Sequence, residues 1–171
     1  MAMITPRFCL DMAQYNTWQN SQIAERIDGV SNATLTRDRG AFFGSILGTL
    51  SHLLWGDLMW MARFDPSVDR PRGTIAQSVD MVSDAQDWQA KRTSTDRTIL
   101  DWAKGLTDQD LDVDLEWTSA STRRRECRPA AFCATHMFNH QTHHRGQVHA
   151  MMTAAGLTAP VSDLFLMPEA A

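Results

Sequence analysis

The sequence AFFGSILGTLSHLLWGDLMWMARF occupies residues 41–64 and repeats apolar side chains every three or four positions. This spacing is the period of an α-helix that buries one face. A helix of this length would extend about 36 Å at 1.5 Å per residue. Asp65 and Pro66 follow the repeat, and proline cannot continue a helix. The stretch therefore predicts one long helix over residues 41–64, with His52 near its middle.

Three other stretches carry a helical period, and a glycine ends each of them. They cover residues 11–27, 80–104 and 130–155, and the glycines are Gly29, Gly105 and Gly156. The stretch at 80–104 is polar in its middle, at residues 91–96. Pro129 stands where a first-turn proline would open the last helix. Residues 31–40 and 65–73 are rich in polar and turn-forming residues, which predicts a loop and a connector.

A short β-hairpin is predicted before the last helix. Residues 111–117, LDVDLEW, alternate apolar and acidic side chains, which is the period of a strand. Residues 118–122 form a polar tip, and the second strand returns through residues 123–127. The tail at 157–171 contains two prolines and is expected to follow an irregular course over the helices. The fold class is therefore all-α, a four-helix bundle with a small β-hairpin, in one domain over residues 1–171.

Composition limits the partners. The 171 residues are 43% hydrophobic, enough for one domain with a substantial core. Sixteen basic and twenty acidic side chains give a net charge of −4, which repels nucleic acid and anionic membrane surfaces. No apolar run reaches the roughly 18 to 20 residues of a membrane span, and residues 1–11 lack the pattern of a secretory signal. We expect a cytoplasmic protein without nucleic-acid or membrane partners.

The cysteines do not suggest a disulfide framework. The chain has three, Cys9, Cys127 and Cys133, and no two of them form a CxxC pair. An odd number of separated cysteines in a cytoplasmic protein is typical of reduced side chains that pack as small hydrophobic groups. We expect all three to be reduced and structural.

Five of the six histidines lie within residues 136–149, on the last predicted helix. They are His136, His140, His143, His144 and His149. At about 100° per residue, the first four point to one side of the helix and His149 points away. The HxxxH pair of His140 and His144 places two imidazoles one turn apart, where both can reach one metal ion. The spacing therefore predicts two ligands from this helix.

The sixth histidine, His52, is surrounded by leucines in the second predicted helix. A buried imidazole needs a polar partner, and a metal ion shared with His140 and His144 provides one. Three neutral imidazoles would leave one or two coordination positions of a divalent ion open for water or substrate. The alternative is a hydrogen-bonded core histidine at His52 and a hydrogen-bonded polar face at His140 and His144.

Several neighbouring residues are secondary candidates. His136 and His143 are candidate alternative ligands, hydrogen-bond partners of the ligands or proton carriers. His149 is expected at the surface or an interface. Asp57 lies about 140° around the helix from His52, so it is expected to support the ligands indirectly or to contact another helix. Arg145 either binds a carboxylate or thiolate substrate or forms an exposed or interfacial salt bridge.

These residues resemble a known family. The string NHQTHHRGQVH at residues 139–149 is similar to the signature of the DinB/YfiT-like metalloenzymes. The string SILGTLSHLLWGDLMW at residues 45–60 resembles the metal-bearing second helix of the same family, and Tyr15, Asn16 and Asn20 resemble its opening. This family is unrelated to the translesion DNA polymerase of the same name. The likeness extends over nearly the whole chain.

The resemblance implies more than the residues alone. It implies an up-down-down-up order of the four helices and commonly a homodimer. The family's ligand positions correspond to His52, His140 and His144, and its usual metals are zinc and nickel. Better-understood relatives use low-molecular-weight thiols, as thiol S-transferases or as a thiol-dependent isomerase. A thiol cosubstrate and a small-molecule substrate are therefore expected, although fold analogy alone does not fix the chemistry.

Two functional hypotheses follow. In the first, the protein is an enzyme whose divalent ion activates a thiol or a water by lowering its pKa, in a reaction like that of a thiol S-transferase or a hydrolase. In the second, it is a non-catalytic dimeric stress-response or metal-binding protein in which the ion is structural. The sequence identifies no general base. A site with room for a ligand beside the ion would favour the enzyme.

Overall fold

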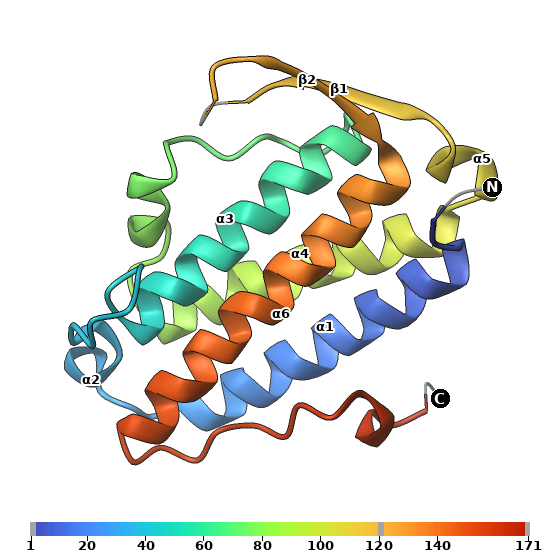
Figure 1. The fold of residues 1–171 in the computed structure, drawn as a ribbon. Helices are drawn as coiled ribbons and strands as arrows, with labels where there is room; N and C mark the ends of the chain where they lie inside the picture. Colours follow the sequence, from blue (N-terminus) through green and yellow to red (C-terminus); the bar gives the residue numbers. More distant parts are fainter. Residues whose placement is uncertain (1–2, 120–121, 170–171) are drawn as a thin grey trace.

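The computed structural model describes residues 3–119 and 122–169. The long helices of this part are α1 (Pro6–Ile27), α3 (Ile46–Phe64), α4 (Ala85–Gly105) and α6 (Ala130–Ala154). In Figure 1, α1 and α6 run in one direction and α3 and α4 run in the opposite one. This confirms the predicted up-down-down-up four-helix bundle. In the described residues, no helix is long and apolar enough to cross a membrane.

Short helical elements occupy the connections. They are α2 (Asn32–Thr36), α5 (Asp108–Leu111) and the 3-10 turns η1 (Ala76–Asp80) and η2 (Leu164–Leu166). The predicted loop at 31–40 therefore contains a short helix, which begins where the Ser31 side chain caps Thr34. The predicted connector at 65–73 does lack helix or strand.

Helix α6 begins at Ala130, as predicted. The other three long helices begin at different residues from those predicted, because capping side chains decide where each of them starts. Helix α1 begins at Pro6 rather than residue 11, since the Thr5 hydroxyl accepts a hydrogen bond from the Phe8 amide at 3.2 Å. Helix α3 begins at Ile46 rather than residue 41, since the Ser45 hydroxyl accepts from the Gly48 amide at 3.0 Å. Residues 41–44 form a turn instead, which ends at Gly44 with a φ of 73°.

Helix α4 begins at Ala85 rather than residue 80, where the Asp84 carboxylate caps the Asp87 amide at 2.9 Å. It continues without a break through the polar residues 91–96. Three of these polar side chains, Arg92, Thr95 and Asp96, are buried in the bundle. The polar middle of this helix is therefore an interior surface and not a solvent-exposed one.

The hairpin lies where it was predicted, with shifted bounds. Strand β1 (Asp114–Thr118) pairs with β2 (Arg125–Pro129) in antiparallel register, and Asp114 faces Pro129. The predicted first strand began at residue 111, but a capping box between Thr107 and Asp110 turns that part into α5. Pro129 is the last residue of β2 and occupies the N-cap position of α6, whereas the sequence predicted it in the first turn of that helix. Part of the predicted tip, residues 120–121, lies outside the described residues.

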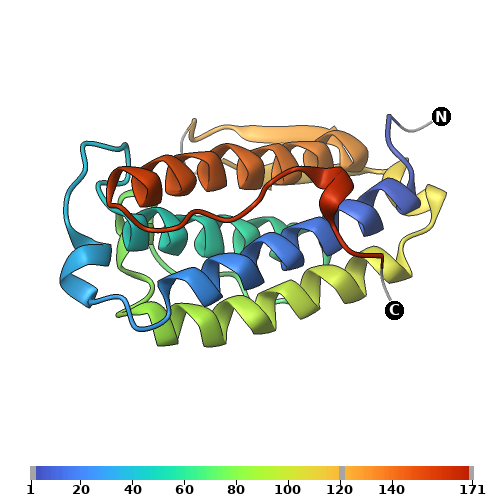
Figure 2. The same cartoon turned by 90° about the horizontal axis from the view of Figure 1, so that it is seen from below.

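The C-terminal tail crosses the bundle in an irregular course, as predicted, with η2 near its end (Figure 2). Side chains of α1 hold it by its main chain. The Tyr15 hydroxyl donates to the Ser162 carbonyl oxygen at 2.5 Å, and the Gln19 amide donates to the Val161 carbonyl oxygen at 2.7 Å. Hydrogen bonds thus tie the tail to α1.

The core has two apolar ends and a polar middle. Ile27, Leu50, Trp88 and Met152 belong to the cluster at one end, and Ala13, Met61, Ile99 and Phe138 belong to the cluster at the other. Cys9 and Cys133 are buried, Cys127 is exposed, and all three are free thiols. Burial raises the pKa of the Cys9 thiol to about 12 and that of Cys133 to about 11. Both thiols are therefore protonated at neutral pH, consistent with a structural role.

We call the polar middle of the core the polar layer. Its members come from all four long helices and are buried: Asn16, Asn20, Asp57, Arg92, Asp96, Gln141 and Arg145. Arg92 lies between two carboxylates, 2.6 Å from Asp57 and 2.9 Å from Asp96. The amides of Asn16 and Asn20 donate to Asp96, and Gln141 donates to Asp57 at 3.0 Å. Buried charges must be paired in this way to be tolerated.

Replacing Arg92 by methionine should destabilise the bundle strongly. The change leaves Asp57 and Asp96 buried without their cation, which typically costs about 3 to 5 kcal/mol of the free energy of unfolding. Urea denaturation followed by circular dichroism measures this free energy. The matched control is Arg97→Met on the exposed face of α4, for which we expect a change within about 0.5 kcal/mol. Equal effects of the two substitutions would show that the layer is not what stabilises the bundle.

Candidate metal centre

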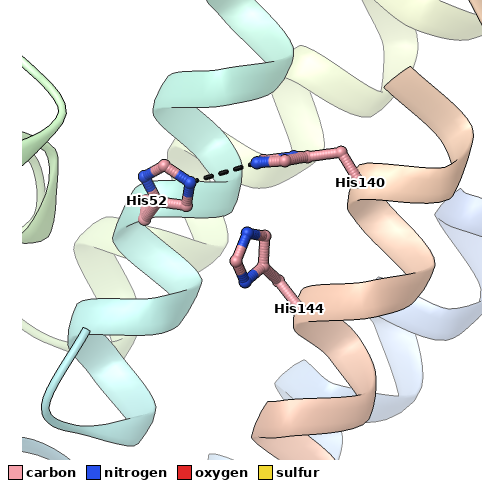
Figure 3. A group of neighbouring side chains, drawn as sticks. All are labelled: His52, His140 and His144. Atoms are coloured by element: carbon pink, nitrogen blue, oxygen red, sulfur yellow. Dashed lines mark hydrogen bonds between the residues drawn. The ribbon is translucent and has the colours of Figure 1, made fainter. Parts of the chain in front are cut away.

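Three histidines meet between α3 and α6. His52 comes from α3, and His140 and His144 come from consecutive turns of α6. Figure 3 shows the three rings pointing toward one another across the space between the helices. One ring nitrogen of each lies within 4.8 Å of those of the other two, and Nε2 of His52 is 3.1 Å from Nε2 of His140. The structure therefore brings together the three residues that the sequence predicts as ligands.

The outer nitrogen of His52 has a fixed role. Its Nδ1 lies 2.8 Å from the Ser78 hydroxyl oxygen, and that hydroxyl donates its own proton to the Ile75 carbonyl oxygen at 2.5 Å. The hydroxyl can therefore only accept a hydrogen bond from the N–H at Nδ1. This leaves Nε2 of His52 with its lone pair, directed toward the other histidines. Ser51 positions this serine, since its hydroxyl donates to the Ser78 carbonyl oxygen at 2.6 Å.

His144 is oriented in the same way. Its Nδ1 lies 2.7 Å from Oε1 of Gln147, one turn further along α6. An amide oxygen only accepts hydrogen bonds, so Nδ1 of His144 carries the proton and Nε2 has the lone pair. The amide nitrogen of Gln147 lies 3.2 Å from Nε2 of His143. Gln147 thus connects the cluster to the neighbouring imidazole.

His140 completes the fit to a cation. Its Nδ1 is buried and has no hydrogen-bond partner among the described residues, and its Nε2 faces that of His52. Two lone pairs at 3.1 Å repel unless a proton or a cation lies between them. Three imidazoles with converging nitrogens are the donor set that first-row divalent ions prefer, and their number suits a site with open positions. The cluster can therefore bind a divalent metal ion.

The histidines are neutral at physiological pH, which metal ligation requires. Burial lowers the pKa of His52 to about 4, and the neighbouring His144 imidazole adds to the shift. Burial and the surrounding imidazoles lower the pKa of His140 to about 3. The pKa of His144 is also lowered, chiefly by burial.

The three histidines line a cavity of about 600 Å³. Its other walls are mainly aromatic and include Phe42, Phe43, Trp55, Trp60 and Trp117. The Phe43 ring stacks on the His52 ring with centroids 3.7 Å apart. Arg63 also lines the cavity, with its guanidinium carbon 4.3 Å from the Trp60 ring centroid and 5.2 Å from that of Trp117. The cluster therefore has space beside it for a small molecule.

The chain is similar to known proteins in its sequence and in its fold. The sequence model of the DinB family matches residues 3–171. The chain belongs to the DinB family. Protein DinB of Bacillus subtilis (strain 168) is 24% identical to it over 157 residues, which cover 91% of each protein. The crystal structure of a DinB-like protein from Bacillus cereus ATCC 10987 has a TM-score of 0.64 and 18% identity, covering 86% of this chain and 90% of that one.

These findings confirm the resemblance found in the sequence. At 18% identity the solved structure establishes only a shared fold. The evidence for a metal site in this chain is therefore the geometry of its own histidines.

His136 and His143 lie at the edge of the cluster. Both line the cavity. The His136 ring centroid is 6.0 Å from that of His140 and 5.0 Å from that of Trp60, and the His143 ring centroid is 4.8 Å from that of His144. Neither belongs to the group whose ring nitrogens converge. The structure thus places them beside the three central histidines, where they can act on a bound molecule.

The remaining candidates point elsewhere. Asp57 belongs to the polar layer and contacts α4 and α6, which is the helix-contact role considered for it. Arg145 is only 7% exposed, so the predicted alternative of an exposed salt bridge is wrong. It donates to Asn16 of α1 instead. His149 is partly buried and lines a different cavity, against α1 and the tail.

Sequence reasoning missed four residues that build the centre: Phe43, Gly56, Ser78 and Gln147. Gln147 could have been found, because it follows His144 by three positions on the same helix face. Gly56 carried a signal too, since a glycine inside a long helix costs about 1 kcal/mol relative to alanine and often marks a place where another group approaches the backbone closely. A Cβ atom added to Gly56 would lie 2.9 Å from Cε1 of His140. Ser78 lies in η1 and Phe43 in the turn before α3. The sequence of neither segment predicts a contact with His52.

The close approach of Gly56 to His140 gives a sharp test of the centre. The substitution Gly56→Ala should displace the His140 ring and weaken zinc binding about tenfold or more, since changes that reorient a ligand typically cost 10 to 100-fold in affinity. The fold should survive, because the group that must move is a side chain. Isothermal titration calorimetry with zinc measures the affinity.

Gly146→Ala is the matched control on α6. A Cβ atom there meets nothing within 4 Å, so zinc affinity should not change. The free energy of unfolding should rise by up to about 1 kcal/mol in this control, because alanine favours helix more than glycine does. Unchanged zinc affinity in Gly56→Ala would contradict the role given to His140.

Proposed function

We propose that this DinB-family protein binds one divalent metal ion per chain through His52, His140 and His144, and that zinc or nickel is the ion. One observation carries the proposal. Three neutral imidazoles converge, and Ser78 and Gln147 orient two of them so that their lone pairs point inward. The low pKa values of His52 and His140 support it, because protons do not compete for these nitrogens at neutral pH.

We further propose that the protein is a metal-dependent enzyme, similar to a thiol S-transferase or a hydrolase, that acts on a small-molecule substrate. A bound divalent ion would lower the pKa of a thiol or a water that coordinates it. The cavity beside the histidines supports this proposal, because it leaves space for a low-molecular-weight thiol as cosubstrate and for the molecule it attacks.

The chain's own residues would handle the substrate. The rings of Phe43, Trp55 and Trp60 line the cavity and would give a bound molecule an apolar surface to pack against. Arg63 offers a positive charge at the same cavity, held against two tryptophan rings. His136 and His143 both line the cavity. The His136 imidazole offers an acceptor for the proton that a thiol or water gives up, whereas Nε2 of His143 already accepts a hydrogen bond from the Gln147 amide and would have to release it first.

A second candidate is a non-catalytic metal-binding or stress-response protein that acts as a dimer. It is favoured by the fact that the histidines link α3 to α6, so a bound ion would connect two helices of the bundle. A homodimer and a cytoplasmic location are part of both proposals. The negative net charge supports a setting away from nucleic acid and anionic membranes.

Metal analysis of the purified protein tests the first proposal. Protein prepared without added metal should contain about one equivalent of zinc or nickel per chain, as measured by inductively coupled plasma mass spectrometry. His52→Ala and His140→Ala should each reduce the content at least about tenfold, because two remaining imidazoles bind a divalent ion weakly. His149→Ala, on the same helix but outside the cluster, should keep the full content. Retention of the metal by His52→Ala would refute the ligand set.

Removal of the ion separates the enzyme from the structural alternative. A chelator should abolish the reaction of a small thiol with an electrophile, while the helical circular dichroism signal stays within about a tenth of its original value. The apolar clusters and the polar layer explain why the fold should survive without the ion. Loss of the helical signal together with the metal would instead favour the structural role.

A further inference from the structure

A second cavity lies on another side of α6. It has a volume of about 300 Å³ and is enclosed by α1, α6 and the C-terminal tail. Tyr15 and Ile23 of α1, Arg145 and His149 of α6 and Pro160 of the tail are among its lining residues. It shares no lining residue with the cavity of the three histidines. Neither functional proposal above makes use of it.

Arg145 is the unusual feature of this cavity. Its side chain is 7% exposed and lines the cavity. The guanidinium donates to Oδ1 of Asn16, and its central carbon lies 5.4 Å from the Tyr15 ring centroid. In the described part of the chain, no carboxylate lies within ion-pair distance of it; Asp57 and Asp96 pair directly with Arg92 and attract Arg145 from further away.

Arg145 makes no direct ion pair, since Asp57 and Asp96 attract its charge only from a longer distance. A carboxylate is the group that matches a guanidinium best. Arginine has five N–H donors in a planar arrangement, and the Asn16 amide oxygen accepts from only one of its nitrogens in the described structure. A carboxylate can accept two parallel hydrogen bonds from such a group. The remaining donors of Arg145 therefore suit a ligand that carries one carboxylate.

The walls of the cavity define the rest of the ligand. The Tyr15 hydroxyl is already committed to the Ser162 carbonyl oxygen, so its ring presents an apolar surface. Ile23 and Pro160 add further apolar surface. Hydrogen bonds from α1 hold the tail in place. Figure 2, a view from below, shows the tail crossing this side of the bundle. A short apolar body fits these walls, and the free N–H groups of one guanidinium match one carboxylate.

We propose that this cavity is a binding site for a small organic monocarboxylate, whose carboxylate pairs with Arg145 and whose apolar part packs against Tyr15 and Pro160. The site is separate from the three-histidine centre. A doubly charged phosphate is a poorer match, because its second charge would have no cation to pair with in the cavity.

Butyrate is a suitable probe, and its neutral analogue butyramide is the control for charge. In a titration of the 171-residue chain followed by amide NMR, butyrate should give saturable shifts at residues 145–149 and at Val161 and Ser162. Butyramide should bind at least about tenfold more weakly, since hydrogen bonds to charged groups are the stronger ones. Shifts without saturation, or equal affinity for the two compounds, would overturn the proposal.

Gly146→Leu tests the place of binding without removing Arg145. Gly146 lines the cavity, and a Cβ atom on it meets nothing within 4 Å, so a leucine can fill the space while α6 stays intact. Butyrate affinity should fall at least about tenfold. Gly105→Leu is the matched control, because this helix glycine is equally open and lies outside the cavity. It should leave the affinity unchanged, and equal affinities of the two variants would overturn the proposal.

His52→Ala separates this site from the three-histidine centre, since a carboxylate could also bind a metal ion there. Butyrate should bind this variant with unchanged affinity and give the same shifts at residues 145–149. Loss of butyrate binding in His52→Ala would place the ligand at the histidines and overturn the second site. This result does not depend on whether the metal proposal is correct.

Discussion

The hydrogen bond from Gln141 to Asp57 determines how α6 lies against α3. The two atoms are 3.0 Å apart and fully enclosed, and Asp57 is held in turn by Arg92. The residues just before them in sequence, His140 and Gly56, are the pair in which the imidazole packs against a bare backbone. A shift of one helix along the other would therefore break the buried hydrogen bond and the imidazole contact together. Because an unpaired buried polar group is costly, this register is strongly specified.

The three histidine rings are oriented by side chains that lie outside the cluster. Ser78 comes from a 3-10 turn and fixes one ring, Gln147 fixes another, and Phe43 lies flat on the first. Two rings are thus held by hydrogen bonds from outside the cluster, and the third, His140, packs against the backbone at Gly56. The inner nitrogens of all three converge. Hydrogen bonds that orient the rings without the help of an ion would reduce the conformational entropy that ion binding costs.

The sequence predicted the architecture and the three central histidines because both depend on local spacing. His140 and His144 are one turn apart in any helix, and His52 is a polar residue within a continuous apolar repeat. Helix starts were less predictable, because Ser45 and Asp84 cap their helices through single hydrogen bonds that compete with the periodic pattern. The burial of Arg145 could not be predicted, since its partner Asn16 is 129 positions away. The same holds for Ser78, whose contact with His52 depends on how a connector folds back on α3.

The way α1 holds the C-terminal tail has an evolutionary consequence. Tyr15, Gln19 and Gln22 all donate to main-chain carbonyl oxygens of Val161 and Ser162. Every amino acid supplies such an oxygen, so the attachment does not depend on which side chains stand at these two positions. The side chains of Val161 and Ser162 are exposed and are free to vary among related proteins while the tail stays in place. Selection should act instead on the donors in α1, which lie far from the segment they hold in the linear chain.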